Sequence, residues 1–212
     1  MLKQLNPRTA ERHRTCHLDP DIRRDVRLNP PENWQPAFGQ IGSSQSYLQR
    51  KGVKEGDLFL FFGWFREVDE NFHFVRGKPD RHVIYGYLQV GSIEKSEEIK
   101  KYDWHPHAAE HRRSEETNAL YLARDTLTED FSDETKPGSG ALEYRGDRVL
   151  TKEGQPSRSV WKDDIPAIRP SNIDSEWAER FKGNRICYNW RWQEMVLKEG
   201  DVSNDWVKSI LR

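Results

Sequence analysis

The chain contains little cysteine and no long apolar segment. Cys16 and Cys187 are its only two cysteines, and their spacing fits no metal motif. Two such thiols are typical of a reducing compartment. No run of 18 apolar residues is present to span a membrane, and the opening sequence MLKQLNPRTAERHR lacks the apolar region of a secretory signal. These absences predict a cytoplasmic protein without a membrane partner.

An excess of basic charge is also missing. Lysine and arginine total 34 against 35 aspartate and glutamate residues, for a formal net charge of −1 at pH 7. This balance excludes a general polycation that coats nucleic acid, but it allows a small basic pocket. The sequence contains neither an HExxH nor a CxxC motif. We therefore expect no cofactor and assign no metal ligands, although a divalent metal stays an open alternative.

Aromatic residues, by contrast, are abundant. Eight tryptophans, seven tyrosines and nine phenylalanines accompany a modest apolar fraction of 34%. Disordered chains are poor in such rings, so the composition indicates a folded protein. A length of 212 residues favours one domain. We predict an α+β protein: an irregular, basic, proline-rich lead segment over residues 1–36, then a single β-rich domain over residues 37–212.

Two segments carry the strongest strand signals. An almost continuous apolar and aromatic run predicts a strand near residues 58–66, and a run rich in β-branched and aromatic residues predicts another near 82–92. The polar excursion between them favours an antiparallel pair. Gly86 indicates a bulge or a close backbone approach. The spacing of apolar residues predicts a short C-terminal helix at about 204–211.

This pattern resembles PUA-like barrels, the superfamily that includes EVE, ASCH and YTH domains. The likeness covers the two strands and their excursion. It implies a curved, mostly antiparallel, barrel-like sheet with a few short helices. Such domains commonly bind nucleic acid, and several hold a flipped modified base in an aromatic cage.

Trp64 and Arg66 stand at the end of the first predicted strand. Alternation places both side chains on one face, where an indole could stack on a base and a guanidinium could hold a phosphate. An equally open interpretation is a core tryptophan and an arginine paired with a surface carboxylate. Gln40 and Gln45 lie near a predicted helix start, where their amides could read base edges or cap the backbone.

Histidines and carboxylates form a second set of candidates. His105 and His107 flank a proline and could point the same way, which suits acid–base work, substrate contact or a structural role. The HLDPD motif adds His17 and places Asp19 and Asp21 on a proline-stiffened loop. These carboxylates could be catalytic acids or a divalent-metal clip, or they could cap turns.

Several of these segments together resemble the nucleotide modification associated domain, type three. The likeness rests on CHLDPDI at 16–22, AFGQ at 37–40 with Gln45 and Leu48, GDLFLFFGWFR at 56–66, HVIYGYLQV at 82–90, HPH at 105–107, NALYLA at 118–123, SRSVW at 157–161 and WQEMV at 192–196. It spans about residues 16–210. The SRSVW segment adds Arg158 to the candidate nucleotide-binding residues.

The resemblance implies a role in making, recognising or processing modified bases, often in phages and in the bacteria that face them. It also implies an N-terminally short member, since relatives begin with an extra strand and an SRKGFDS-type loop before the HLDPD motif. We expect recognition or processing of a modified base in DNA, in a phage-related modification or defence context. A DNA glycosylase or hydrolase acting on a modified nucleotide, and a non-catalytic subunit of a modification system, are the alternatives.

Whether the protein is an enzyme, and how it oligomerises, stay open at this point. If a glycosylase, Asp19 or Asp21 would supply the carboxylate, with His105 or His107 assisting. We further expect at least four of eight residues to line one pocket, Trp64 and Arg66 among them: His17, Asp19, Gln40, Gln45, Trp64, Arg66, His105 and His107.

Overall fold

A computed structural model describes residues 19–113, 116–128, 131, 133–179, 181–182, 185–186 and 194–212. Strands and short helices are mixed along this part of the chain, which confirms the predicted α+β class. In the described residues, no helix has both the length and the apolar character needed to cross a membrane.

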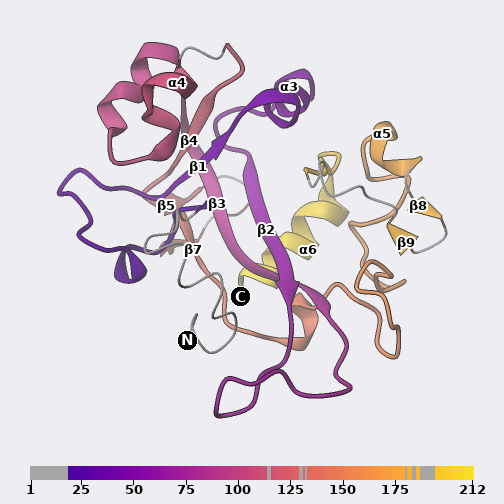
Figure 1. Ribbon diagram of the computed structural model, residues 1–212. Helices are drawn as coiled ribbons and strands as arrows, with labels where there is room; N and C mark the ends of the chain where they lie inside the picture. The colour runs from indigo at the N-terminus through magenta and orange to yellow at the C-terminus, as the bar shows by residue number, and fades with distance from the viewer. Residues whose placement is uncertain are drawn as a thin grey trace.

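An antiparallel sheet forms the centre of the molecule (Figure 1). Its strand order is β1-β4-β3-β2, and β7 also pairs with β3. The predicted pair of strands is confirmed as adjacent and antiparallel, with Leu58 opposite Gln89 and Phe65 opposite Arg81. The strands of this sheet are β1 (Ala37–Gln40), β2 (Leu58–Phe65), β3 (Arg81–Lys95), β4 (Ala119–Ala123) and β7 (Ser139–Ala141).

The expected barrel is not formed, because the sheet stays open. In the described residues β1 and β2 are its two end strands and do not pair with each other. Register shifts at Phe61/Phe62 and between Val90 and Ser92 interrupt the ladders of β3. Gly86 has the close approach that the sequence indicates: a Cβ there would lie 2.5 Å from Cδ1 of Ile22. The sheet is thus irregular and open, and the segment before β1, which contains Ile22, packs against it.

Short elements surround the sheet. The helices are α3 (Gly42–Arg50), α4 (Glu110–Arg113), α5 (Ser175–Ala178) and α6 (Asp201–Leu211), and the 3₁₀ turns are η1 (Arg24–Val26), η2 (Ser96–Tyr102), η3 (Pro106–Ala108) and η5 (Gly146–Arg148). Two small antiparallel pairs complete the set: β5 (Thr126–Leu127) with β6 (Asp133–Pro137), and β8 (Phe181–Lys182) with β9 (Arg185–Ile186).

Large rings fill the main core, as the composition suggests. Phe38 from β1 packs edge-on against Phe59 and Phe61 from β2, with ring centroids 5.2 Å apart in both pairs. The ring centroid of Tyr121, from β4, lies 5.0 Å from that of Phe59. Burial of such side chains contributes about 1.5–3 kcal/mol each, so these rings hold the sheet and the elements around it together.

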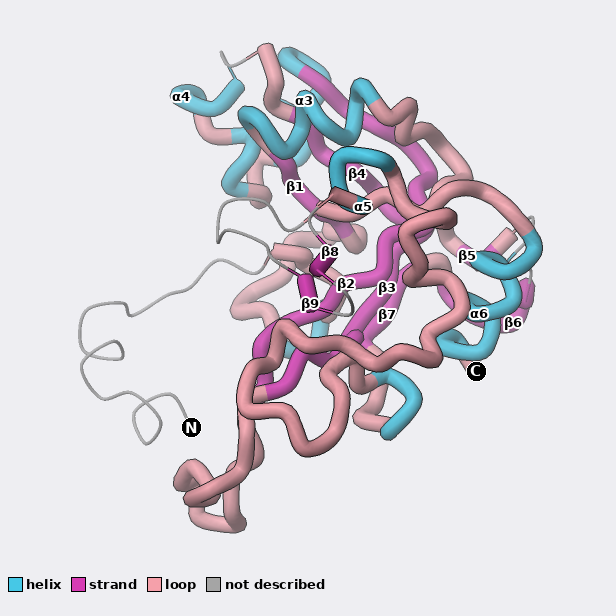
Figure 2. The backbone as a smooth tube through the Cα atoms, turned by 90° about the vertical axis from the view of Figure 1, so that its right-hand side faces the viewer, coloured by secondary structure: helices cyan, strands magenta, loops and turns pink. Residues whose placement is uncertain are grey.

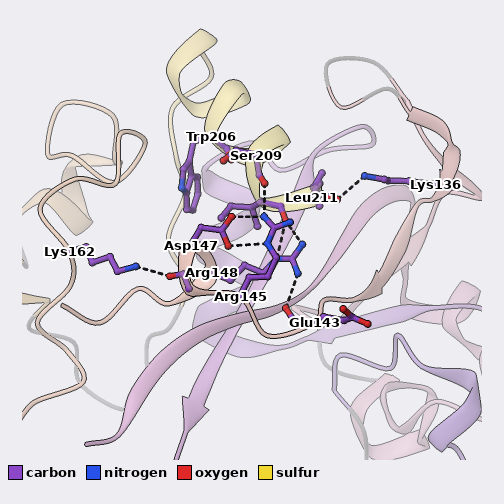
Figure 3. A network of polar contacts seen from close by, with 11 residues as sticks. Lys136, Glu143, Arg145, Asp147, Arg148, Lys162, Trp206, Ser209 and Leu211 are labelled. Atoms are coloured by element: carbon purple, nitrogen blue, oxygen red, sulfur yellow. Dashed lines mark hydrogen bonds and ion pairs between the residues drawn. The ribbon is translucent and has the colours of Figure 1, made fainter. Parts of the chain in front are cut away.

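The C-terminal helix is confirmed, beginning at Asp201, three residues before the predicted start. Three basic side chains bind carbonyl oxygens of its last turn (Figure 3). Arg148 is buried and donates to Ile210 O from Nε and Nη2, at 3.0 and 2.8 Å. Arg145 donates to Ser209 O at 3.1 Å, and Lys136 to Leu211 O at 2.9 Å. These cations lie where a helix exposes unpaired carbonyls and negative dipole charge.

Replacing Arg148 should therefore loosen the helix. Arg148→Met removes the bonds to Ile210 O and a third bond, from Nη1 to Glu143 O at 2.7 Å, and leaves buried carbonyls unpaired. We expect the free energy of unfolding to fall by about 2–4 kcal/mol in urea titrations. Arg145→Met also removes a bond to the helix, that to Ser209 O, but this bond lies near solvent, so we expect a loss below about 1 kcal/mol. Equal effects of the two substitutions would show that the buried bonds of Arg148 are not the main contribution.

Candidate functional site

Trp64 is the centre of the first group of candidate residues. It lies near the end of β2, opposite His82, and its side chain is 60% exposed. The guanidinium of Arg158 lies 4.3 Å from the centroid of the indole ring, in cation–π contact. Trp64 is therefore a surface residue, and the alternative of a core tryptophan is wrong.

Arg66 is held in place beside Trp64. Its Nε lies 2.5 Å from Oδ1 of Asp80, and its guanidinium carbon lies 4.9 Å from the Phe74 ring. The Arg66 guanidinium holds the pKa of the Asp80 carboxyl below its usual range, and a hydrogen bond from Trp64 adds to this effect. Asp80 thus orients both Trp64 and Arg66. We call Trp64, Arg66, Asp80 and Arg158 the Trp64 surface.

Two arginines at this surface form no ion pair among the described residues. Arg158 contacts the indole, and its charge also acts on the Asp80 carboxyl. Nη1 of Arg81 donates to the Tyr144 hydroxyl at 3.3 Å. An exposed ring beside these guanidinium groups suits a group that combines a flat base with a phosphate.

His82 lies buried below this surface, and sequence reasoning missed it. Its Nδ1 accepts a hydrogen bond of 3.0 Å from Trp161 Nε1, and its backbone N–H donates to Thr151 Oγ1 at 2.8 Å. Burial lowers the pKa of His82 to about 4, and the charge of Arg158 acts in the same direction. A neutral, fixed imidazole therefore supports the strand that carries Trp64. Its position opposite Trp64 in the ladder was the available signal.

Asp19 belongs to a second group of candidates, next to β1. Its Oδ1 accepts a hydrogen bond of 3.2 Å from the backbone N–H of Gly39. Gly39 has to be glycine, because a Cβ there would lie 2.3 Å from Cδ2 of His107. Asp19 and His107 thus meet at one residue of β1. We call Asp19, Gly39, His105 and His107 the Asp19 group.

Both histidines of the Asp19 group are buried. Nδ1 of His107 lies 2.6 Å from Oδ1 of Asn118, whose Nδ2 donates back to His107 O at 2.9 Å. Nδ1 of His105 accepts from the His107 N–H at 3.2 Å. These bonds fix the imidazole of His107 against the Gly39 backbone.

The carboxyl group of Asp19 has an unusual proton affinity. Although the residue has a large exposed fraction, burial of the carboxyl raises its pKa to about 6, against the opposing effects of the Gly39 N–H and the Arg112 charge. Burial also raises the pKa of Tyr85, and the charge of Asp19 contributes. A carboxyl group with this pKa can both accept and release a proton near neutral pH.

Asp21 has different surroundings, although it lies only two residues away. It is fully buried, forms an ion pair with Arg27, and its backbone pairs with that of Ala37. Arg27 also donates to Trp104 O at 2.7 Å. These are the contacts of a structural ion pair that fixes the segment before β1.

The two glutamines point into the structure. Gln45 is buried and accepts a 2.8 Å hydrogen bond from the Tyr121 hydroxyl. Gln40 Nε2 donates to Glu194 Oε1 at 2.7 Å, while Ser44 Oγ donates to Glu194 Oε2 at 2.9 Å. His17 lies outside the described residues. Of the described candidates, Trp64 and Arg66 therefore belong to the Trp64 surface, Asp19, His105 and His107 to the Asp19 group, and the glutamines to neither. A single pocket holding four of the eight stays a prediction.

Within the described ranges, no three histidine, cysteine, aspartate or glutamate side chains are arranged to hold a metal ion. A shallow depression of about 400 Å³ lies elsewhere and contains none of the predicted residues; it is lined by Gly91, Ala123, Arg124, Asp125, Thr126 and Thr128.

An open antiparallel sheet surrounded by short helices, with an exposed tryptophan–arginine surface, defines an α+β domain. A family comparison identifies which one. The model of nucleotide modification associated domain 3 matches residues 1–198, so the chain belongs to that family. No curated protein and no solved structure matches the chain. The family's name associates it with nucleotide modification.

The buried His82 makes stability depend on pH. Its pKa is about 4 in the folded protein against 6.5 ordinarily, so between these values the unfolded chain binds the additional proton. Stability should fall as the pH drops from 6.5 to 4, by about 3 kcal/mol over that window. The raised pKa of Asp19 acts in the opposite sense between about 6 and 3.8.

The two effects can be separated by comparing Asp19→Asn with the Asp19→Asn, His82→Asn double variant in urea titrations at several pH values. Asparagine keeps an acceptor near the position of Nδ1 but does not titrate. The double variant should lose most of the decline between pH 6.5 and 4. Parallel profiles of the two proteins would show that His82 is not the responsible group.

Proposed function

We propose that the protein binds a nucleotide or DNA carrying a modified base through the Trp64 surface, within a phage-related modification or defence system in the cytoplasm. The observation that carries this proposal is the exposed indole of Trp64, held beside the guanidinium of Arg158 at 4.3 Å. Membership of a family named for nucleotide modification supports the class of ligand. Binding of this kind requires no cofactor.

The chemistry of the surface divides between the base and the phosphate. Stacking of one base on an aromatic side chain contributes about 1–3 kcal/mol. Arg158 already contacts the indole, so a base would use the exposed remainder of the ring. Arg158 and Arg81 would contact phosphate, since neither forms an ion pair in the described chain. Arg66 would act from a fixed position, because Asp80 holds its guanidinium.

Removal of the indole tests this proposal. Trp64→Ala should weaken binding to modified phage DNA by about 5- to 150-fold, the equivalent of one lost stacking contact, while the urea midpoint stays near that of the wild type. Phe65→Ala is the matched control, because Phe65 is also exposed but contacts Tyr85 with ring centroids 5.8 Å apart. Equal affinity of the wild type for modified and plain DNA would argue against base readout.

We also propose a second candidate function, hydrolysis of a modified nucleotide or of its glycosidic bond, at Asp19. The observation that favours it is the carboxyl pKa of about 6, combined with the Gly39 N–H and the charge of Arg112 nearby. A carboxylate in this setting could take one proton from a water molecule as its oxygen bonds to the sugar carbon, while the glycosidic bond breaks and the base leaves with that bond's electron pair. His107 would support the site by fixing the backbone at Gly39.

Substitution of this carboxyl separates the two candidates. Modified phage DNA incubated with the wild type should yield abasic sites, and Asp19→Asn should reduce their rate of formation by at least about 100-fold. Asp25→Asn serves as a control, because Asp25 is an exposed carboxylate on the same segment, paired with Arg23. Abasic product that persists in Asp19→Asn would exclude this role, whereas binding without any product would favour recognition alone.

A further inference from the structure

The segment between β2 and β3 forms a hairpin that projects from the body of the molecule (Figures 1 and 2). Residues 66–80 are ordered by their own backbone bonds: Asp69 N–H donates to His73 O at 2.9 Å, and Val75 N–H to Glu67 O at 3.1 Å. Val68 and Phe74 form a β-bridge. The hairpin is thus a defined structural feature that extends the strands carrying the Trp64 surface.

Its tip carries an aromatic residue in a conformation that favours glycine. Phe72 has a φ of 62°, in a turn closed by a 3.0 Å hydrogen bond from its N–H to Asp69 O. Glycine or asparagine usually occupies this left-handed position. The Phe72 side chain is also substantially exposed, so packing does not explain its presence. A strained and exposed aromatic residue at a hairpin tip indicates a role for the ring outside the fold.

Further apolar surface surrounds Phe72. Five of the nine large hydrophobic residues that are exposed in the described chain lie between Trp64 and Phe74. They are Trp64, Phe65, Val68, Phe72 and Phe74. Exposed apolar side chains are therefore concentrated in the hairpin and the end of β2 that leads into it.

Basic side chains gather at the base of the hairpin, whereas Asp69 and Glu70 lie at its tip. Arg66 pairs with Asp80, and Lys78 lies 3.4 Å from Glu67. Among the described residues, Arg76 and Arg81 form no ion pair, and the charge of Arg158 acts on the Asp80 carboxyl. Residues 66–81 together with Arg158 contain five Lys/Arg against four Asp/Glu, a net charge of +1, so an anionic partner would be held at the base of the hairpin.

We propose that this hairpin is a wedge that enters a DNA duplex, with Phe72 filling the space of a base that has moved out to the Trp64 surface. The inference rests on the proposed function and specifies double-stranded DNA as the substrate. A base inside a duplex cannot stack on a protein ring until it leaves the helix. Apolar side chains inserted between base steps stabilise the opened duplex, and the arginines at the base of the hairpin would hold the flanking phosphates.

A mismatched duplex tests the wedge without knowledge of the modified base, because a mismatch lowers the cost of moving a base out. The probes are a short labelled duplex with one central T·T mismatch, the same duplex fully paired, and the mismatch strand alone. A 2-aminopurine next to the mismatch reports unstacking by its fluorescence. The wild type should prefer the mismatched over the paired duplex by about tenfold or more and raise the fluorescence.

Phe72→Gly should abolish this preference and the fluorescence rise, yet bind the single strand within about twofold of the wild type. It should be at least as stable as the wild type, since glycine adopts the positive φ freely. Loss of the preference therefore cannot be attributed to unfolding. Asn71→Gly, the matched control at the tip, should behave as the wild type. A Phe72→Gly protein that keeps the mismatch preference would overturn the wedge and leave the hairpin as a contact for another protein.

The single strand distinguishes this result from failure of the proposed function. If the wild type binds the single strand and Trp64→Ala does not, the Trp64 surface is supported whatever Phe72→Gly does. Single-strand binding by the wild type without any mismatch preference overturns the wedge alone. A wild type that binds none of the three probes and no modified phage DNA overturns both proposals.

Discussion

Backbone pairing along β3 is the constraint on which the rest of the structure depends. This one strand of fifteen residues pairs with β2 over its first part and with β4 over its last, while β7 pairs with residues 86–88. Its two ends therefore set the separate positions of the candidate groups. The Trp64 surface lies where β3 begins, and β1, which bears Gly39, is reached from its other end through β4.

The two groups differ in how far their charged side chains are buried. At the Trp64 surface, arginines stay near solvent, and the one carboxylate, Asp80, fixes two ligand-binding candidates at once. Next to β1, burial dominates and moves the pKa of Asp19 toward neutrality. The first setting suits reversible contact with an anion, because screened charges bind without a large desolvation cost. The second suits proton transfer, which requires a pKa near the working pH.

The long apolar runs made β2 and β3 predictable. Arg66 lies just beyond β2 and pairs with a carboxylate, as the alternative interpretation expected. The partners of Trp64 and Arg66 were not predictable from local pattern. Asp80 lies in a polar loop fourteen residues beyond Arg66, and Arg158 entered only through the family resemblance. Asp19 and Asp21 look equivalent in the HLDPD motif, but only Asp21 has the ion pair with Arg27 and the bridge to Ala37. Gln45 is buried because Tyr121, 76 positions away, supplies its partner.

The register of β2 links these observations. Trp64 and Phe65 point to opposite faces of the strand, so one contacts Arg158 and the other contacts Tyr85, the neighbour of Asp19. A shift of one residue would exchange the two faces and turn the indole away from the arginines. The irregularity between Phe61 and Phe62 occurs just before this point and sets which side chain faces which group. This interruption costs pairing energy, but it directs the side chain of Trp64 toward the arginines. Bulges beside binding sites commonly redirect side chains in this way.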